Sequence, residues 1–197
     1  VVFYEKESPT VASRLPKILV VDDEPRNVKL LEAILRPLNY EVIKAFNGED
    51  ALTIINKVDV DLVLLDVMMP LMDGYEVCRR LKASEATRLI PVVMVTALDS
   101  VEDKINGIEA GADDFLTKPP NKMELLARSK SLIKLKKLND NLASVEYVLF
   151  SLAKTVEAKD EYTQGHVERV SQLAIALGNK MGLSDREMES LRYGGVL

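Results

Sequence analysis

The chain of 197 residues carries a formal net charge of −5, and 47% of its residues are apolar and 29% charged. This length suits one ordinary domain and part of a second. The negative charge argues against a nucleic-acid partner, and no apolar run approaches the roughly 18 residues that a membrane-spanning helix needs. Residues 1–16 lack the apolar core of a signal peptide. The single cysteine, Cys78, excludes an internal disulfide and is expected in the core, so we expect a cytoplasmic protein.

From Lys17 to about Arg128, short apolar runs alternate with amphipathic stretches. The predicted strands are Ile18–Val21, Glu41–Ala45, Leu62–Leu65, Val92–Val95 and Asp114–Leu116. The predicted helices are Pro25–Leu35, Gly48–Asn56, Gly74–Leu81 and Val101–Ile108, with Pro25 in a first turn and Gly111 as a stop signal. This alternation is typical of a parallel sheet covered on both faces. We therefore predict an α/β, flavodoxin-like (βα)5 fold with strand order 2-1-3-4-5.

The chain changes character after Pro119-Pro120, because residues 122–159 contain neither Gly nor Pro. Apolar residues recur there at alternating spacings of three and four: Leu135, Leu138, Leu142, Val145, Leu149, Leu152 and Val156. This seam covers about 33 Å of helix and predicts a parallel coiled coil that forms a homodimer. The alternative is a long helix that packs on its own domain. The nearby lysines, Lys130 to Lys137, are expected to form a solvated helix face.

The last segment also has a helical pattern. Thr163 can cap a helix that ends at Met181, and Gly182 can stop it. Ser184 and Glu187 have the spacing of a capping box. The chain therefore divides into a tail (1–16), an α/β domain (17–125), a long signalling helix (126–160) and a small helical segment (161–197).

Four predicted strands end in polar residues. Asp22 and Asp23 follow the first strand, Asp66 the third, Thr96 the fourth and Lys118 the fifth. Ligands of open parallel sheets bind outside the carboxyl ends of the strands, so these groups should converge on one edge. Each motif alone is weak, since Asp-Asp before a helix is also a common cap. Their coincidence in four βα units predicts a functional site.

Clustered carboxylates repel, by roughly 4 kcal/mol for two charges about 4 Å apart at an effective dielectric near 20. A divalent cation offsets that repulsion, and Mg²⁺ (or Mn²⁺) suits oxygen ligands of this kind. Asp66 can then act as a nucleophile for a phosphoryl group, and Lys118 can neutralise the charge that builds up. The Thr96 hydroxyl can donate to a phosphoryl oxygen. Lys118-Pro119 is a candidate cis peptide that would aim the lysine inward.

Residues 17–130 resemble the receiver domain of two-component response regulators. The matching segments are Ile18–Glu24, Leu65–Pro70, Met72–Gly74, Val95–Ala97 and Gly111–Pro119. The resemblance implies that Asp66 is the phosphoacceptor for a histidine kinase, and that the metal ligands are Asp22, Asp23, Asp66 and the main-chain carbonyl of Met68. It implies a switch made of Thr96, Phe115 and Lys118. Pro120 departs from the pattern, in which an aromatic or aliphatic residue often follows Lys-Pro.

Residues 158–170 read AKDEYTQGHVERV and resemble the entry of HD-GYP domains, metal-dependent phosphodiesterases that act on cyclic di-GMP. The resemblance makes His166 the first metal ligand of such a domain. The chain has no His-Asp pair, no Gly-Tyr-Pro and no second histidine, and one imidazole cannot build a two-metal site. We therefore expect a receiver that signals to an incomplete output domain, with a vestigial His166 and no enzymatic activity in this chain.

Two other functions stay open. A phosphatase of the haloacid dehalogenase type would also use Asp66 as its nucleophile, but it usually needs a second acid two residues on, where this chain has Met68. A constitutive dimerisation adaptor would leave the acidic pocket unused.

Overall fold

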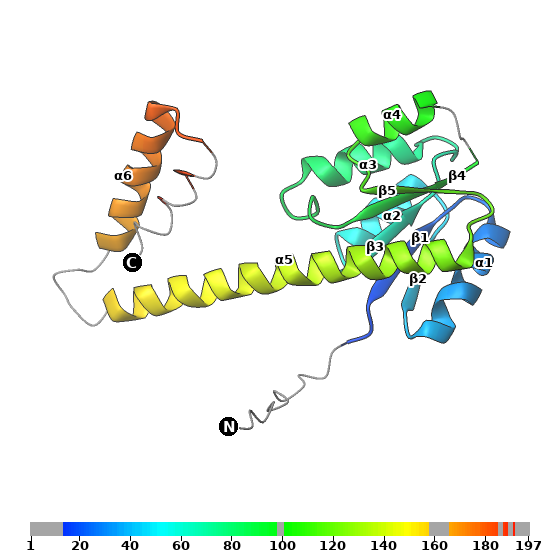
Figure 1. Ribbon diagram of the computed structural model, residues 1–197, viewed down its shortest axis with the longest axis horizontal. Helices are drawn as coiled ribbons and strands as arrows, with labels where there is room; N and C mark the ends of the chain where they lie inside the picture. Colours follow the sequence, from blue (N-terminus) through cyan, green and yellow to red (C-terminus); the bar gives the residue numbers. More distant parts are fainter. Residues whose placement is uncertain (1–13, 98–100, 158–165, 185–186, 189–190, 192–197) are drawn as a thin grey trace, which may run out of the picture. The chain divides into compact units, whose positions relative to one another are not determined.

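The computed structural model describes residues 14–97, 101–157, 166–184, 187–188 and 191. Its elements in chain order are β1 (Lys17–Val21), α1 (Pro25–Leu35), a 3-10 turn η1 (Arg36–Leu38), β2 (Glu41–Ala45), α2 (Gly48–Ile55), β3 (Leu62–Leu65), α3 (Gly74–Ala83), β4 (Val92–Thr96), α4 (Val101–Glu109), β5 (Asp114–Thr117), α5 (Lys122–Glu157) and α6 (His166–Met181). The strands form one parallel sheet in the order β2-β1-β3-β4-β5, which confirms the predicted fold (Figure 1). No helix among the described residues is long and apolar enough to cross a bilayer.

Alternate residues of the strands feed two separate cores, because successive side chains of a strand point to opposite faces of the sheet. On one face, Leu19, Val63 and Met94 pack against α2 and α3, and Cys78 is buried among them as expected. On the other face, Ile18, Val20, Leu62, Leu64 and Val93 pack against α1 and the first turns of α5. The central strands are apolar throughout because both of their faces are covered.

The predicted elements and the observed ones differ mainly at their ends. Three strands gain a terminal residue, at Lys17, Thr96 and Thr117. Pro25 stands in the first turn of α1, and Gly111 follows α4 with a φ of 89°, where a glycine is favoured. The Lys118-Pro119 peptide is cis.

Helix α5 begins before residue 126, where the sequence pattern predicts the start of the long signalling helix. It starts at Lys122 and continues unbroken to Glu157, and its side chains Leu125 and Ile133 are buried against the sheet. The start of the long helix therefore belongs to the α/β domain. Two compact units are separated at residues 138 and 139, and each is described by itself.

Beyond residue 138, the described residues are helical apart from the turn that follows α6. Gly182 ends α6 with a φ of 68°, and the Ser184 backbone N–H donates to Glu187 Oε2 at 2.8 Å, as expected for a capping box. Gly178 is buried in α6, and a Cβ there would lie 2.6 Å from Met188 Sδ. Thr163 lies outside the described residues, and so does the side chain of His166, the first residue of α6.

Candidate functional site

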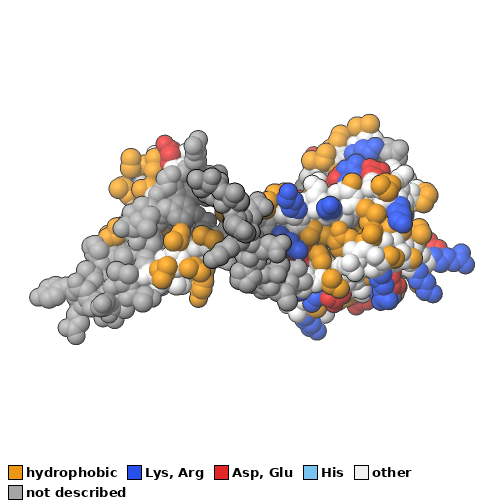
Figure 2. All heavy atoms as spheres, turned by 60° about the horizontal axis from the view of Figure 1, so that its bottom comes forward, with side chains coloured by type: hydrophobic (Ala, Val, Ile, Leu, Met, Phe, Trp, Pro, Cys, Tyr) orange, Lys and Arg blue, Asp and Glu red, His pale blue; other side chains and the backbone are white. Residues whose placement is uncertain are grey.

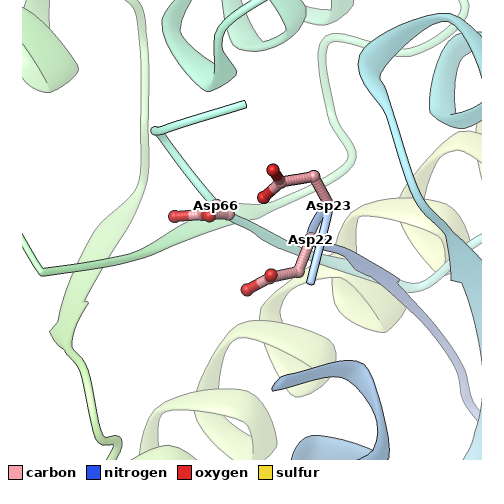
Figure 3. Close-up of side chains that lie close together, drawn as sticks. All are labelled: Asp22, Asp23 and Asp66. Carbon is pink, nitrogen blue, oxygen red and sulfur yellow. The ribbon is translucent and has the colours of Figure 1, made fainter. Parts of the chain in front are cut away.

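Strand register brings two of the predicted acids together. Val21 of β1 pairs with Leu65 of β3, so the next residues, Asp22 and Asp66, leave the sheet side by side. The Asp66 backbone N–H donates to the Val21 carbonyl at 2.8 Å, which extends the ladder by one bond. Asp23 follows on the same loop, and Figure 3 shows the three carboxylates extending in the same direction. The edge on which they lie is the predicted carboxyl edge.

Lys118 connects the two buried carboxylates. Its Nζ atom lies 2.6 Å from Asp22 Oδ2 and 2.8 Å from Asp66 Oδ2. Its backbone N–H donates to the carbonyl of Thr96, because Thr96 of β4 pairs with Thr117 of β5. Burial alone would lower the pKa of Lys118, but the hydrogen bonds to Asp22 and Asp66 outweigh it and raise that pKa. The lysine is therefore a cation fixed between two acids.

Asp66 is 4% exposed, so its carboxyl group is largely removed from water. Burial raises its pKa, the hydrogen bond from Lys118 opposes that rise, and the nearby charge of Asp22 adds to it. A weak hydrogen bond of 3.4 Å comes from the backbone N–H of Met68. Groups that stabilise the ionised form of Asp66 are therefore needed if it is to act as a nucleophile at neutral pH.

The close turn after Asp66 depends on Gly74. A Cβ at residue 74 would lie 2.2 Å from the Asp66 carbonyl oxygen, and the Gly74 N–H donates to the Val67 carbonyl at 2.9 Å. Leu71, within this turn, has a φ of 70° and a fully exposed side chain. The loop therefore folds tightly enough to hold Asp66 and Met68 at the rim of the sheet.

The three acids form a donor set that fits a hard divalent cation. One carboxylate oxygen from each of Asp22, Asp23 and Asp66 lies within 4.8 Å of the others, and Asp23 is exposed while its two neighbours are buried. Oxygen-only ligands, with one open side for water or a phosphoryl oxygen, match the preference of Mg²⁺. The residues present thus fit the cation that the sequence predicts; the contribution of the Met68 carbonyl stays a prediction.

Thr96 and Phe115, the predicted switch residues, lie on neighbouring strands. Thr96 is a buried residue at the end of β4, and Phe115 on β5 is half-buried. The ring of Phe115 lies against Gly107 of α4, where an added Cβ would be 2.3 Å from a ring carbon. Tyr75 of α3 donates to the backbone carbonyl of Asp103, also on α4, at 3.1 Å. Helix α4 therefore contacts both the aromatic residue of β5 and helix α3.

Sequence reasoning missed the residues that position these groups. Asn27 of α1 donates to Asp22 Oδ1 at 3.0 Å, and Gly107 makes room for the Phe115 ring. Asn27 lies one helical turn after the Asp22-Asp23 pair, and this spacing could have predicted that its side chain reaches the acids. No comparable signal existed for Gly107, because its role depends on how β5 and α4 pack.

Comparison with known proteins agrees with this arrangement. Residues 18–130 match the family model of the response regulator receiver domain. Response regulator PleD of Caulobacter vibrioides is 52% identical over 130 residues, which is 66% of this chain and 29% of that protein.

Two solved structures share the fold. The receiver domain of a Francisella response regulator is 36% identical, with a TM-score of 0.57 over 60% of this chain and 97% of that one. The signal receiver domain of an HD domain-containing protein from Pseudomonas fluorescens is 26% identical, with a TM-score of 0.59 over 63% of this chain and 98% of that one. The chain belongs to the response regulator receiver domain family of two-component signalling.

Proposed function

We propose that this chain receives a phosphoryl group on Asp66 from a histidine kinase, in a Mg²⁺-dependent reaction. Receiver domains interact with such kinases, and PleD, a curated relative, is itself named a response regulator. The observation that carries the proposal is the Lys118 ammonium, which lies within 2.8 Å of both buried acids at the edge where Asp23 is exposed. This geometry provides a nucleophile, a fixed cation and a donor set for a metal in one place.

In this proposal a carboxylate oxygen of Asp66 attacks the phosphorus of a phosphohistidine. A P–O bond forms, the P–N bond breaks, and the imidazole leaves with a proton from solvent. Lys118 already faces Asp66 and can bind an oxygen of the incoming group, which offsets its added negative charge. A bound Mg²⁺ would neutralise charge on the transferring phosphoryl group. Asp22 and Asp23 would hold that ion with Asp66.

The phosphorylated Asp66 would then act on Thr96 and Phe115. Thr96 follows Met94 and Val95 on β4, and its backbone carbonyl accepts from the N–H of Lys118, so a shift of the lysine reaches β4 directly. Phe115 contacts α4 through Gly107. We propose that movement of these groups changes the packing of β5 and α4 and is passed to α5.

The output is proposed to pass through a dimer of α5. Each described seam side chain from Leu135 to Leu152 is 49–63% exposed, although all are large and apolar. Figure 2 shows that hydrophobic side chains lie at the surface of the part of the chain that the structure describes. A second copy that presents the same seam would cover them.

The segment after α5 is proposed to belong to an HD-GYP-type output domain of a longer parent, and this chain is proposed to have no phosphodiesterase activity of its own. A receiver domain of an HD domain-containing protein shares this fold, which supports that combination.

Acetyl phosphate labelling of the whole chain tests the phosphotransfer. Mg²⁺ should allow one acyl phosphate per chain, cleaved by hydroxylamine, and Asp66→Asn should abolish it. Asp73→Asn is the matched control, because Asp73 is a nearby carboxylate that caps α3 and Asn also caps helices. Label that persists in Asp66→Asn would contradict the assignment.

A constitutive dimerisation adaptor is the second candidate, favoured by the exposure of the α5 seam. It predicts the same dimer with and without phosphorylation, whereas a switch predicts different dimerisation constants or exchange rates. A phosphatase that uses Asp66 as its nucleophile would release phosphate from acetyl phosphate continuously. The rate of that release would exceed the rate at which a receiver hydrolyses the acyl phosphate on its aspartate.

A further inference from the structure

Asp22 is buried, and its contacts use most of its capacity to accept hydrogen bonds. A carboxylate has about four acceptor positions. Oδ1 accepts from the backbone N–H of Glu24 at 2.9 Å and from Asn27 Nδ2 at 3.0 Å, whereas Oδ2 accepts from Lys118 at 2.6 Å. The contacts among the described residues therefore leave one position, on Oδ2, the atom that also faces Lys118. Asp22 can offer a cation one oxygen in one direction.

Asn27 is itself held in place. Its Nδ2 group also lies 3.3 Å from Glu24 Oε2. Both partners are carboxylate oxygens, which only accept, so the amide nitrogen rather than the amide oxygen faces them. The two hydrogens of one neutral amide thus lie between two negative groups. This bridge reduces their repulsion without adding a positive charge that would compete with a metal.

We propose that Asn27 is a positioning residue of the phosphoryl-transfer site: it locks Asp22 Oδ1, so that Oδ2 alone is presented to Lys118 and to a divalent cation. The proposal rests on the proposed function, because it concerns the same site. The Glu24 bond is a local turn contact two residues along the chain and constrains Oδ1 from one side only. The Asn27 amide comes from the first turn of α1 and adds a second direction, which prevents rotation of the carboxylate about its Cβ–Cγ bond.

The expected effect follows from the behaviour of residues that orient metal ligands. Their removal typically lowers metal affinity by about 10-fold to 100-fold. In Asn27→Ala, Asp22 can turn Oδ1 towards Lys118 and away from the position of the cation. The free-Mn²⁺ signal in electron paramagnetic resonance, measured on the whole unphosphorylated chain, should report binding at least tenfold weaker than in the wild type.

The matched control is Asn47→Ala. Asn47 also stands at the start of a helix, is half-buried, and donates its Nδ2 to a carboxylate, Asp50 Oδ2, at 2.8 Å. Among the described residues its side-chain hydrogen bonds are with Asp50 rather than with Asp22, Asp23 or Asp66, so its removal should lower stability through the lost cap and leave Mn²⁺ affinity unchanged. A second variant, Asn27→Leu, keeps the side-chain volume but removes the donor and should weaken Mn²⁺ binding like Asn27→Ala.

Labelling by acetyl phosphate supplies a second readout. The Mg²⁺ concentration for half-maximal labelling should rise by the same factor as the Mn²⁺ dissociation constant, and by more than the maximal rate falls. If Asn27 had a purely structural role, its removal would lower stability without raising the half-maximal Mg²⁺ concentration more than it lowers the maximal labelling rate. If both Asn27 variants bind Mn²⁺ within twofold of the wild-type affinity, the positioning role of Asn27 is overturned. The proposed function still stands in that case, provided that acetyl phosphate labels the wild type. A wild type that neither binds Mn²⁺ nor is labelled would overturn both.

Discussion

The ring of Phe115 occupies the space that a Cβ on Gly107 would need. The added carbon would lie 2.3 and 2.5 Å from two ring carbons and 3.1 Å from Met94 Sδ, and contacts under about 3 Å are not tolerated. Gly107 is buried inside α4, where a glycine is about 1 kcal/mol less favourable than alanine. Close packing of β5 against α4 therefore explains a glycine at a position where the helix alone would favour alanine.

We predict that the effect of Gly107→Ala on stability changes sign with the residue at 115. In the wild type, overpacking should lower the free energy of unfolding by roughly 1–2 kcal/mol. In Phe115→Ala the ring is gone, so the same substitution should raise it by about 1 kcal/mol through helix propensity. Urea unfolding of the wild type, the two single variants and the double variant gives the coupling energy between residues 107 and 115 directly.

Asn106→Ala is the control for that cycle. Asn106 precedes Gly107 on the same helix and is exposed, so its substitution should add helix propensity equally in both backgrounds. If Gly107→Ala has the same effect with and without the ring, the contact between the two residues does not determine which side chain fits at 107.

Ser129 is the second position where packing predicts a measurable change. It is completely buried on α5, and its Oγ atom has no hydrogen-bond partner among the described residues. A buried hydroxyl without a partner costs about 1 kcal/mol or more, so Ser129→Ala should raise the free energy of unfolding by about 1 kcal/mol. Ser144→Ala, which removes an exposed hydroxyl that donates to the Asp140 carbonyl, should change stability by less than about 0.5 kcal/mol. A destabilised Ser129→Ala protein would mean that the hydroxyl has a partner that matters for folding.

Sequence pattern predicted the features that depend on chain periodicity. Strand ends carry Asp22, Asp66, Thr96 and Lys118 to one edge because parallel strands share a direction, and apolar runs mark strands covered on both faces. Features that depend on contact between elements were not predicted. The start of α5 belongs to the α/β domain because Leu125 and Ile133 meet the sheet, a fact that the unbroken helical pattern of 122–159 does not reveal.

The pKa of Asp66 predicts how stability depends on pH without a divalent cation. A carboxyl group with a raised pKa in the folded state binds its proton more tightly when the chain is folded. Its contribution to stability is therefore present below the unfolded pKa of about 4 and is lost as the pH rises through the folded pKa. Asp66→Asn, which removes the ionisable group, should be more stable than the wild type at pH 7.

The difference between these two proteins should shrink as the pH falls below about 4, where Asp66 is protonated in both states of the wild type. Thermal unfolding in EDTA across pH 3.5–7.5 measures it. Added Mg²⁺ should stabilise the wild type more than the variant, since an ion that binds only the folded state shifts unfolding by mass action. A variant that is less stable than the wild type at pH 7 in EDTA would show that ionised Asp66 stabilises the fold.

The α5 seam predicts the oligomeric state. A buried charge in an apolar seam is strongly unfavourable, so Leu142→Lys should convert a dimer to a monomer in sedimentation velocity experiments. Tyr147→Lys is the control, because Tyr147 is an exposed residue of the same helix outside the three-and-four spacing, and it should leave the dimer intact. Both variants lie beyond the part of α5 that packs on the sheet, so phosphorylation of Asp66 by acetyl phosphate should continue in each. A wild type that stays monomeric at high concentration, or a loss of the dimer in both variants, would show that α5 does not pair along this seam.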